Sequence, residues 1–334
     1  MKDLLLITPP FTQLNTPYPA TVYLKGFLNT KNISSYQIDL GIEVILEIFS
    51  KKGVTEIFNV KPKNLSENAQ RIFALREEYI KTIDEVIAFL QNKKPTLARQ
   101  ICSMNFLPEA SRFNQLDDME YAFGNMGLQD KAKHLATLYL EDLSDYIVEN
   151  IDENFGFSRY AERLGRSANS FDELYEKLQS EKTFVDNFTL EILDKKLLET
   201  KPKLVCFSVL FPGNLYSAFR CAQYIKNHYP KIKTAFGGGF ANTELRDLKD
   251  KRVFEFFDFI TLDDGELPIE LLFENICHFE QSEESLFKRT FLLENGEVVY
   301  KNNSERHDYK QAEIGTPDYT DLPLDQYISV IEIA

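Results

Sequence analysis

The segment that decides the fold is residues 203–239, KLVCFSVLFPGNLYSAFRCAQYIKNHYPKIKTAFGGG. Its first part, Leu204 to Leu210, is an almost continuous apolar run, which is typical of a strand covered on both faces. A turn with proline and glycine follows, then residues 215–230 with the apolar spacing of a helix, and then a short apolar run that ends in three glycines. Strand, helix and strand in this order predict two parallel strands joined by a helical crossover.

The same alternation of strand and helix occurs on both sides of this segment. Residues 3–53 contain two strand patterns that alternate with two helix patterns, and residues 256–279 contain one more strand pattern followed by a helix. Five apolar strands with helical crossovers predict an α/β fold, a Rossmann-like doubly wound parallel sheet in the flavodoxin-like order 2-1-3-4-5.

The strand patterns fall into two blocks, so we expect the Rossmann-like domain to consist of residues 1–60 and 201–285. Between them, residues 61–200 show helical apolar spacing and predict a large all-helical insertion. Residues 286–334 are interpreted as a hairpin and a linker, because Asn295-Gly296, the favoured pair of a type I′ turn, separates two apolar runs. The sequence stops inside an apolar, strand-like run after Tyr327, which leads us to expect a further domain beyond it.

Composition limits the possible classes of function. The chain of 334 residues has a net charge of -14, which argues against nucleic-acid binding and against an anionic membrane surface, because both require clustered Lys and Arg. No apolar run approaches the length of a membrane span and the N-terminus has no signal-peptide pattern, so we expect a cytoplasmic protein. The scattered cysteines and histidines have no metal-ligand spacing, which argues against a zinc or iron–sulfur site made by this chain alone.

The loops that follow the five predicted strands form the candidate site. In doubly wound sheets, ligands bind beyond the carboxyl ends of the strands, near the point where the strand order reverses. For Asp264 and Glu266, which stand beside a glycine at a helix start, capping of that helix is the alternative role. We predict a cofactor-binding site made of these loop residues: Pro9, Pro10, Phe11, Asp39, Ser208, Phe211, Pro212, Gly213, Asn214, Gly237, Gly238, Gly239, Asp264, Gly265 and Glu266.

Three consecutive glycines, Gly237 to Gly239, are unusual in a chain with only 14 glycines. They match neither the G-x-G-x-x-G dinucleotide fingerprint, which follows the first strand of a unit, nor a Walker A loop, because no Gly-Lys-Ser/Thr follows. Without Cβ atoms they offer a flat backbone surface to a bulky ligand, and the alternative is a tight turn between strand and helix. The loops contain no Ser-His-Asp set and no acid–base histidine, so we expect a cradle for a large cofactor and no catalytic residues.

In their order, these loops resemble the cobalamin-binding domain found at the N-terminus of many radical SAM enzymes. The matching segments flank the insertion: LLLITPPFTQLNTPYPATVYLKGFL, YQIDLGIEV, LVCFSVLFPGNLYSAFRCAQYIK, KIKTAFGGGFANTEL, FFDFITLDDGELPIELL and PDYTDLPLDQY. The resemblance implies a cobalamin (B12) at the carboxyl ends of the strands, with Gly237 to Gly239 facing its nucleotide tail. It further implies that Ser208 and residues 211–214 lie along the tail or the corrin, and that the Pro9-Pro10 loop covers part of the corrin edge.

The resemblance also implies a partner domain in the same parent chain, a radical SAM barrel that would bind S-adenosylmethionine and a 4Fe-4S cluster. This chain would then hold cobalamin without being catalytic by itself. The D-x-H-x-x-G motif, whose histidine ligates cobalt in other cobalamin domains, does not occur here, so we expect no protein histidine on the cobalt.

Two alternatives to a cobalamin domain stay open. The first is a Rossmann-like scaffold that binds no cofactor and contacts a substrate or partner through its helical insertion, where Arg159, Arg163 and Arg166 could form a contact surface or pair with local acids. The second is an independent flavin or nucleotide enzyme, against which the missing phosphate-binding motif after the first strand argues.

Overall fold

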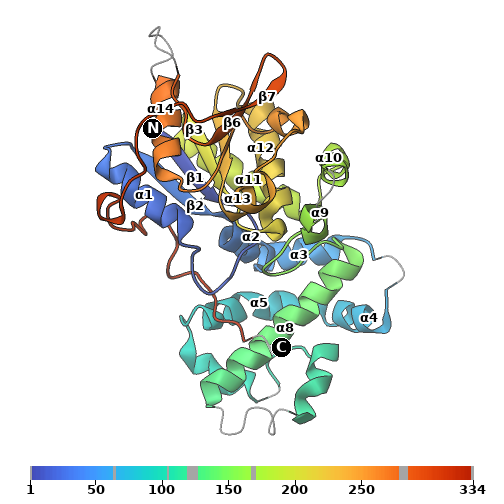
Figure 1. Ribbon diagram of the computed structural model, residues 1–334. Coiled ribbons are helices and arrows are strands. Elements are labelled where there is room, and N and C mark those ends of the chain that lie inside the picture. Colours follow the sequence, from blue (N-terminus) through green and yellow to red (C-terminus); the bar gives the residue numbers. More distant parts are fainter. Residues whose placement is uncertain are drawn as a thin grey trace.

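The computed structural model describes residues 2–62, 65–103, 105–118, 127–166, 171–277 and 285–331. They form an α/β protein around a 7-stranded sheet in the order β2-β1-β3-β4-β5-β6-β7 (Figure 1). The predicted doubly wound sheet and its order 2-1-3-4-5 are confirmed. The parallel strands are β1 (Leu4–Thr8), β2 (Ser35–Asp39), β3 (Leu204–Ser208), β4 (Lys233–Gly237) and β5 (Phe259–Thr261).

The predicted hairpin consists of β6 (Thr290–Glu294) and β7 (Glu297–Lys301). Asn295 and Gly296 both have positive φ angles, 51° and 81°, as a type I′ turn requires. β6 pairs with β5 in the antiparallel direction, so the hairpin extends the parallel sheet at its β5 side.

Helices cover both faces of the sheet, as the alternation of side chains along β1 shows. Leu4 and Leu6 belong to an apolar cluster with residues of α1 (Ala20–Thr30) and α14 (Glu266–Cys277). Leu5 and Ile7 belong to a larger cluster on the opposite face, with residues of α2 (Leu40–Ile48), α11 (Phe184–Thr200) and α12 (Leu215–His228). Because successive residues of a strand face opposite sides, burial of both sets explains why the strand is apolar throughout.

The described residues between 61 and 200 contain helices and no strand, which confirms the all-helical insertion. Its helices α4 (Glu67–Ala74), α5 (Arg76–Leu90) and α8 (Leu128–Asn150) lie in the lower half of the molecule in Figure 1, whereas α11 packs against α2 and α12 at the sheet. Tyr79 of α5 and Tyr139 of α8 are fully buried with ring centres 5.0 Å apart, where the two long helices meet. The other α-helices are α3 (Lys51–Asn59), α6 (Ala98–Ile101), α9 (Glu162–Arg166), α10 (Asp172–Gln179) and α13 (Gly239–Glu244). The 3-10 helices are η1 (Pro95–Leu97), η2 (Ser111–Asp118), η3 (Pro212–Asn214), η4 (Lys251–Glu255) and η5 (Gln311–Glu313).

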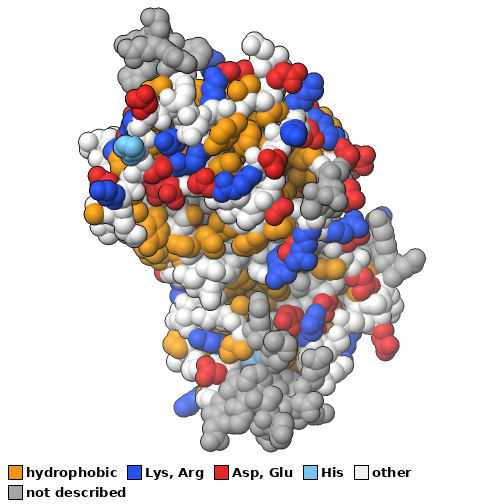
Figure 2. Space-filling model, viewed as in Figure 1, with side chains coloured by type: hydrophobic (Ala, Val, Ile, Leu, Met, Phe, Trp, Pro, Cys, Tyr) orange, Lys and Arg blue, Asp and Glu red, His pale blue; other side chains and the backbone are white. Residues whose placement is uncertain are grey.

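The carboxyl ends of β1 and β3 face the helical insertion. Phe11, in the loop after β1, packs edge-on against Phe155 and Tyr160 of the insertion, with ring centres 5.9 Å apart in both pairs. The backbone N–H of Tyr160 donates to the carbonyl of Gly213, after β3 (2.8 Å). Figure 2 shows a band of hydrophobic side chains across the middle of this face, between the half with the sheet and the helical half.

The last described residues run between these two halves. Tyr327 donates its hydroxyl to the carboxylate of Asp39 at the end of β2 (2.8 Å), and the N–H of Ile328 donates to the carbonyl of Leu14 (2.9 Å). The N–H of the next residue donates to the last carbonyl of α5 (2.9 Å). This segment therefore connects the loop after β1 to the insertion. In the described part of the chain, no helix is both long enough and apolar enough to cross a membrane.

Candidate functional site

A pocket of about 250 Å³ lies at the carboxyl ends of β3, β4 and β5, on the sheet face that α1 and α14 cover. We call it the carboxyl-edge pocket. Strand residues form its back wall, the two helices form its sides, and the loop after β5 forms its mouth. It is lined by Leu6, Ala20, Thr21, Tyr23, Leu24, Cys206, Phe207, Ser208, Ala235, Phe236, Gly237, Gly238, Thr261, Asp263, Asp264, Gly265, Glu266 and Ile269.

Part of the predicted site is in this pocket. Ser208, the last residue of β3, is 7% exposed, and its hydroxyl has no hydrogen-bond partner among the described residues. Ser208 Oγ is not among the fully buried side-chain atoms that lack a hydrogen-bond partner, so water can reach it from the pocket and a ligand could replace that water with a hydrogen bond of its own. The predicted residues that line the pocket are Ser208, Gly237, Gly238, Asp264, Gly265 and Glu266.

The three glycines are explained first by the packing of the chain on itself. Gly238 has a φ of 103°, and a Cβ atom there would lie 2.5 Å from the carbonyl oxygen of Val209. A Cβ atom on Gly239 would lie 2.8 Å from the carbonyl oxygen of Leu210. The N–H of Val209 also donates to the carbonyl of Gly237 (2.8 Å). The tight-turn interpretation therefore accounts for Gly238 and Gly239, although the backbone of Gly237 and Gly238 still forms part of the pocket wall.

The loop after β3 is occupied by contacts within the protein. Asn214 is fully buried, and its Oδ1 accepts from the N–H groups of Leu210 (3.2 Å) and Phe211 (3.3 Å), which closes the turn. A Cβ atom on Gly213 would lie 3.1 Å from Cβ of Arg159, so the insertion presses directly on this loop. Pro212 lies against α9 in the same way. Residues 211–214 all lie within the described part of the chain, and none of them lines the carboxyl-edge pocket.

Phe211 instead contributes to a separate depression of about 320 Å³ with Gln13, Tyr18, Arg159 and Arg166. Both arginines pair there with Glu162, at 3.3 Å for Arg159 and 2.8 Å for Arg166. The sequence leaves two roles open for these arginines, a contact surface or pairing with local acids, and Arg159 and Arg166 make the second kind of contact.

The loop after β1 and the end of β2 are also buried. Pro9, Pro10 and Phe11 are all buried, and Phe11 belongs to the main apolar cluster. Asp39 is the N-cap of α2 and accepts from the N–H of Gly41 (3.0 Å), besides the bond from Tyr327. Burial raises the pKa of the Asp39 carboxyl to about 6. The structure therefore gives these predicted site residues positions in the core and at a helix cap, outside the lining of the carboxyl-edge pocket.

The mouth of the carboxyl-edge pocket is acidic. Arg289, in the loop before β6, donates to the carbonyls of Leu262 (3.2 Å) and Asp264 (3.1 Å) and so holds the mouth loop in place. Asp263, Asp264 and Glu266 line the mouth. The described lining includes no basic residue, but Arg246 and Arg289 (3.7 Å) pair with Asp263 from outside it. Burial raises the pKa of the Glu266 carboxyl above its ordinary value. Such a mouth disfavours ligands that carry several phosphate charges.

The helical sides of the pocket are missing from the site that the sequence predicts. α1 follows β1 and is expected to cross the sheet, but which of its residues meet β3 and β4 depends on tertiary packing. The available signal is the pair of small residues at the start of α1, Ala20 and Thr21, because small side chains leave room above a sheet. The omitted residues from the helices are Ala20, Thr21, Tyr23, Leu24 and Ile269.

Fold and site together define an open, doubly wound α/β protein with a ligand-sized pocket at the carboxyl edge of its sheet. Comparison of the chain with family models, with curated proteins and with solved structures finds no match in any of the three. Within the ranges that the structure describes, no group of three or more His, Cys, Asp or Glu side chains could hold a metal ion.

Proposed function

We propose that this chain is a cobalamin-binding domain and that the carboxyl-edge pocket receives the nucleotide tail of the cofactor. The observation that carries the proposal is an apolar slot at the ligand-binding edge of the sheet, with the unpartnered hydroxyl of Ser208 inside it. The small side chain of Ala235 leaves room for a flat aromatic ring, and the backbone of Gly237 and Gly238 forms part of the wall beside it. A volume of about 250 Å³ suits such a ring, whereas the corrin macrocycle would have to lie outside the pocket.

Each wall of the pocket has a role in this proposal. Ser208 would bond to a polar atom of the tail, while Leu24 and Ile269 would pack against its ring from the helices. The acidic mouth favours cobalamin over the flavin or nucleotide alternative, because the cobalamin tail has one phosphodiester charge and dinucleotides have a pyrophosphate. When bound, cobalamin supplies a cobalt centre that carries a methyl group in methyl-transfer reactions.

The proposal extends to the surroundings of the cofactor. We propose that this chain gives the cobalt no imidazole ligand, because the sequence has no D-x-H-x-x-G motif. We also propose that the domain works in the cytoplasm beside a radical SAM barrel of the same parent chain, which would hold S-adenosylmethionine and the 4Fe-4S cluster. The free cysteines Cys102, Cys206, Cys221 and Cys277 are in keeping with a reducing compartment.

A scaffold without cofactor is the second candidate, and one observation favours it. The resemblance implies that the Pro9-Pro10 loop covers the corrin edge and that residues 211–214 lie along the tail or the corrin. In the structure, Phe11 of the first loop and the loop 211–214 contact Phe155, Arg159 and Tyr160 of the insertion. In that case the carboxyl edge of β1 and β3 would serve mainly to anchor the insertion, and the insertion would contact the substrate or partner.

Hydroxocobalamin separates the two candidates. The purified chain is mixed with an excess of hydroxocobalamin and desalted, and the absorbance of the corrin is measured against the protein concentration. Cobalamin binding predicts a coloured protein that approaches one corrin per chain. Colourless protein at high micromolar concentration would contradict the proposal and favour the scaffold. Electron paramagnetic resonance of the reduced, cobalt(II) form tests the missing histidine, since coupling from a protein imidazole nitrogen would overturn that part.

A further inference from the structure

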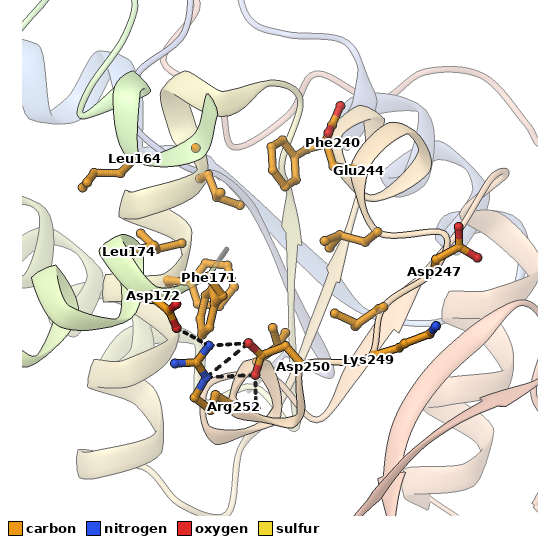
Figure 3. Close-up of a pocket in the computed structure, with 16 residues that line it drawn as sticks. Leu164, Phe171, Asp172, Leu174, Phe240, Glu244, Asp247, Lys249, Asp250 and Arg252 are labelled. Carbon is orange, nitrogen blue, oxygen red and sulfur yellow. Dashed lines mark hydrogen bonds and ion pairs between the residues drawn. The ribbon is translucent and has the colours of Figure 1, made fainter. Parts of the chain in front are cut away.

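A second cavity, of about 450 Å³, shares no residue with the carboxyl-edge pocket. It lies where the insertion meets the sheet domain, with α9 and α10, which pack against α12, on one side and α13 and η4 on the other (Figure 3). We call it the lateral pocket. Its volume falls within the range of pockets that take small organic ligands.

The interior of the lateral pocket is apolar. In Figure 3, Leu164, Leu174 and Phe171 lie on one side of the cavity and Phe240 lies on the other. Phe171 packs against Phe219 of α12, with ring centres 5.2 Å apart. Leu164 and Phe171 are only partly buried, so an apolar ligand would remove more of their surface from water.

The rim of the lateral pocket is charged, with four carboxylates against two basic groups. Arg252 is already engaged, because it pairs with Asp172 of α10 (2.7 Å) and with Asp250, and thereby joins the two sides of the cavity. Glu244 and Asp247 are exposed, and neither makes an ion pair within the described ranges. Both lie on the α13 side of the cavity, as Figure 3 shows.

We propose that the lateral pocket binds an organic cation that combines a positively charged amine with an apolar ring or chain. The apolar interior would bury the ring or chain, and the unpaired carboxylates of Glu244 and Asp247 would attract the ammonium group. An anionic ligand of the same shape would meet these two carboxylates with only Lys249 to offset them. The lateral pocket is separate from the proposed cobalamin site, so either proposal can fail without the other.

Three probes of one shape test the charge preference on the native chain: 2-phenylethylamine, 2-phenylethanol and phenylacetate. Their affinities are measured by isothermal titration calorimetry and by ligand-observed NMR. The amine is expected to bind about fivefold more tightly than the alcohol, as two exposed carboxylates allow, and phenylacetate is expected to bind more weakly still. No binding of the amine at millimolar concentration, or equal binding of amine and acid, overturns the proposal.

Two variants place the amine in the lateral pocket. Glu244→Gln with Asp247→Asn should weaken amine binding about fivefold and leave binding of the alcohol unchanged. Leu164→Trp should weaken binding of both probes, because the larger ring takes up part of the cavity. The control is Glu56→Gln with Glu67→Gln, two exposed acids outside the lateral pocket, which should change nothing. If Leu164→Trp does not fold, the charge variants decide alone, and amine binding that they leave unchanged overturns the proposal.

Discussion

Replacement of Gly238 by alanine tests the packing at the centre of the carboxyl edge. The φ of 103° and ψ of -173° at Gly238 belong to a region that is essentially open to glycine only, and occupying it with another residue costs about 1–3 kcal/mol. The new Cβ atom would also lie 2.5 Å from the carbonyl oxygen of Val209, and overpacking of this kind costs about 1–3 kcal/mol more. Gly238→Ala should therefore lower the free energy of unfolding by about 4 kcal/mol.

Gly296→Ala is the matched control. Gly296 also has a positive φ, 81°, but a Cβ atom there would meet nothing within 4 Å, so only the backbone strain remains. We expect a loss of about 1 kcal/mol. Both variants are measured by urea unfolding followed by circular dichroism. Equal losses for the two glycines would refute the reasoning, because the close approach of Val209 would then contribute nothing.

Two further predictions concern buried charges. Burial raises the pKa of Asp39 from 3.8 to about 6, so its favourable contribution to stability is present below about pH 4 and is lost as the pH rises through about 6. Asp39→Asn should remove up to about 3 kcal/mol of this pH dependence, measured by urea unfolding between pH 4 and 7. An unchanged pH profile would show that Asp39 titrates normally. Arg220→Met should cost about 3–5 kcal/mol, because Arg220 and Asp186 form an ion pair at 3.0 Å with both side chains 3% exposed. Lys195→Met, which breaks an exposed pair with Glu191, should cost less than about 0.5 kcal/mol, and similar losses for both would contradict the role of burial.

The strand order and the hairpin follow from local patterns in the sequence. The apolar run of β3 and the pair Asn295-Gly296 each carry enough information, because strand burial and a type I′ turn depend on few residues. The position of the helical insertion does not follow from such patterns. Phe11, which the sequence places at the candidate site, is buried against Phe155 and Tyr160, and these contacts between distant segments cannot be predicted from local patterns.

The candidate site, like the fold, can be predicted only in part from local patterns in the sequence. Position at the end of a strand is enough to place Ser208 and Gly237 at the carboxyl edge, because the carboxyl ends of parallel strands meet at one edge of the sheet. The role of Gly238 cannot be predicted from its position, since the steric need comes from Val209, which follows the neighbouring strand β3. Tyr23 and Leu24 of α1 were missed because helix rotation over a sheet is set by packing between distant segments.

The most direct test of the account is the affinity for hydroxocobalamin of three chains: native, Ser208→Ala and Ser35→Ala. Ser35 is a matched control, because it is also a buried strand serine whose hydroxyl lacks a partner among the described residues, but it begins β2 at the opposite edge of the sheet. If the carboxyl-edge pocket holds the nucleotide tail, Ser208→Ala should weaken binding about tenfold, as loss of one hydrogen bond implies, and Ser35→Ala should leave it unchanged. No binding by the native chain, or equal affinities for all three chains, would contradict the central claim.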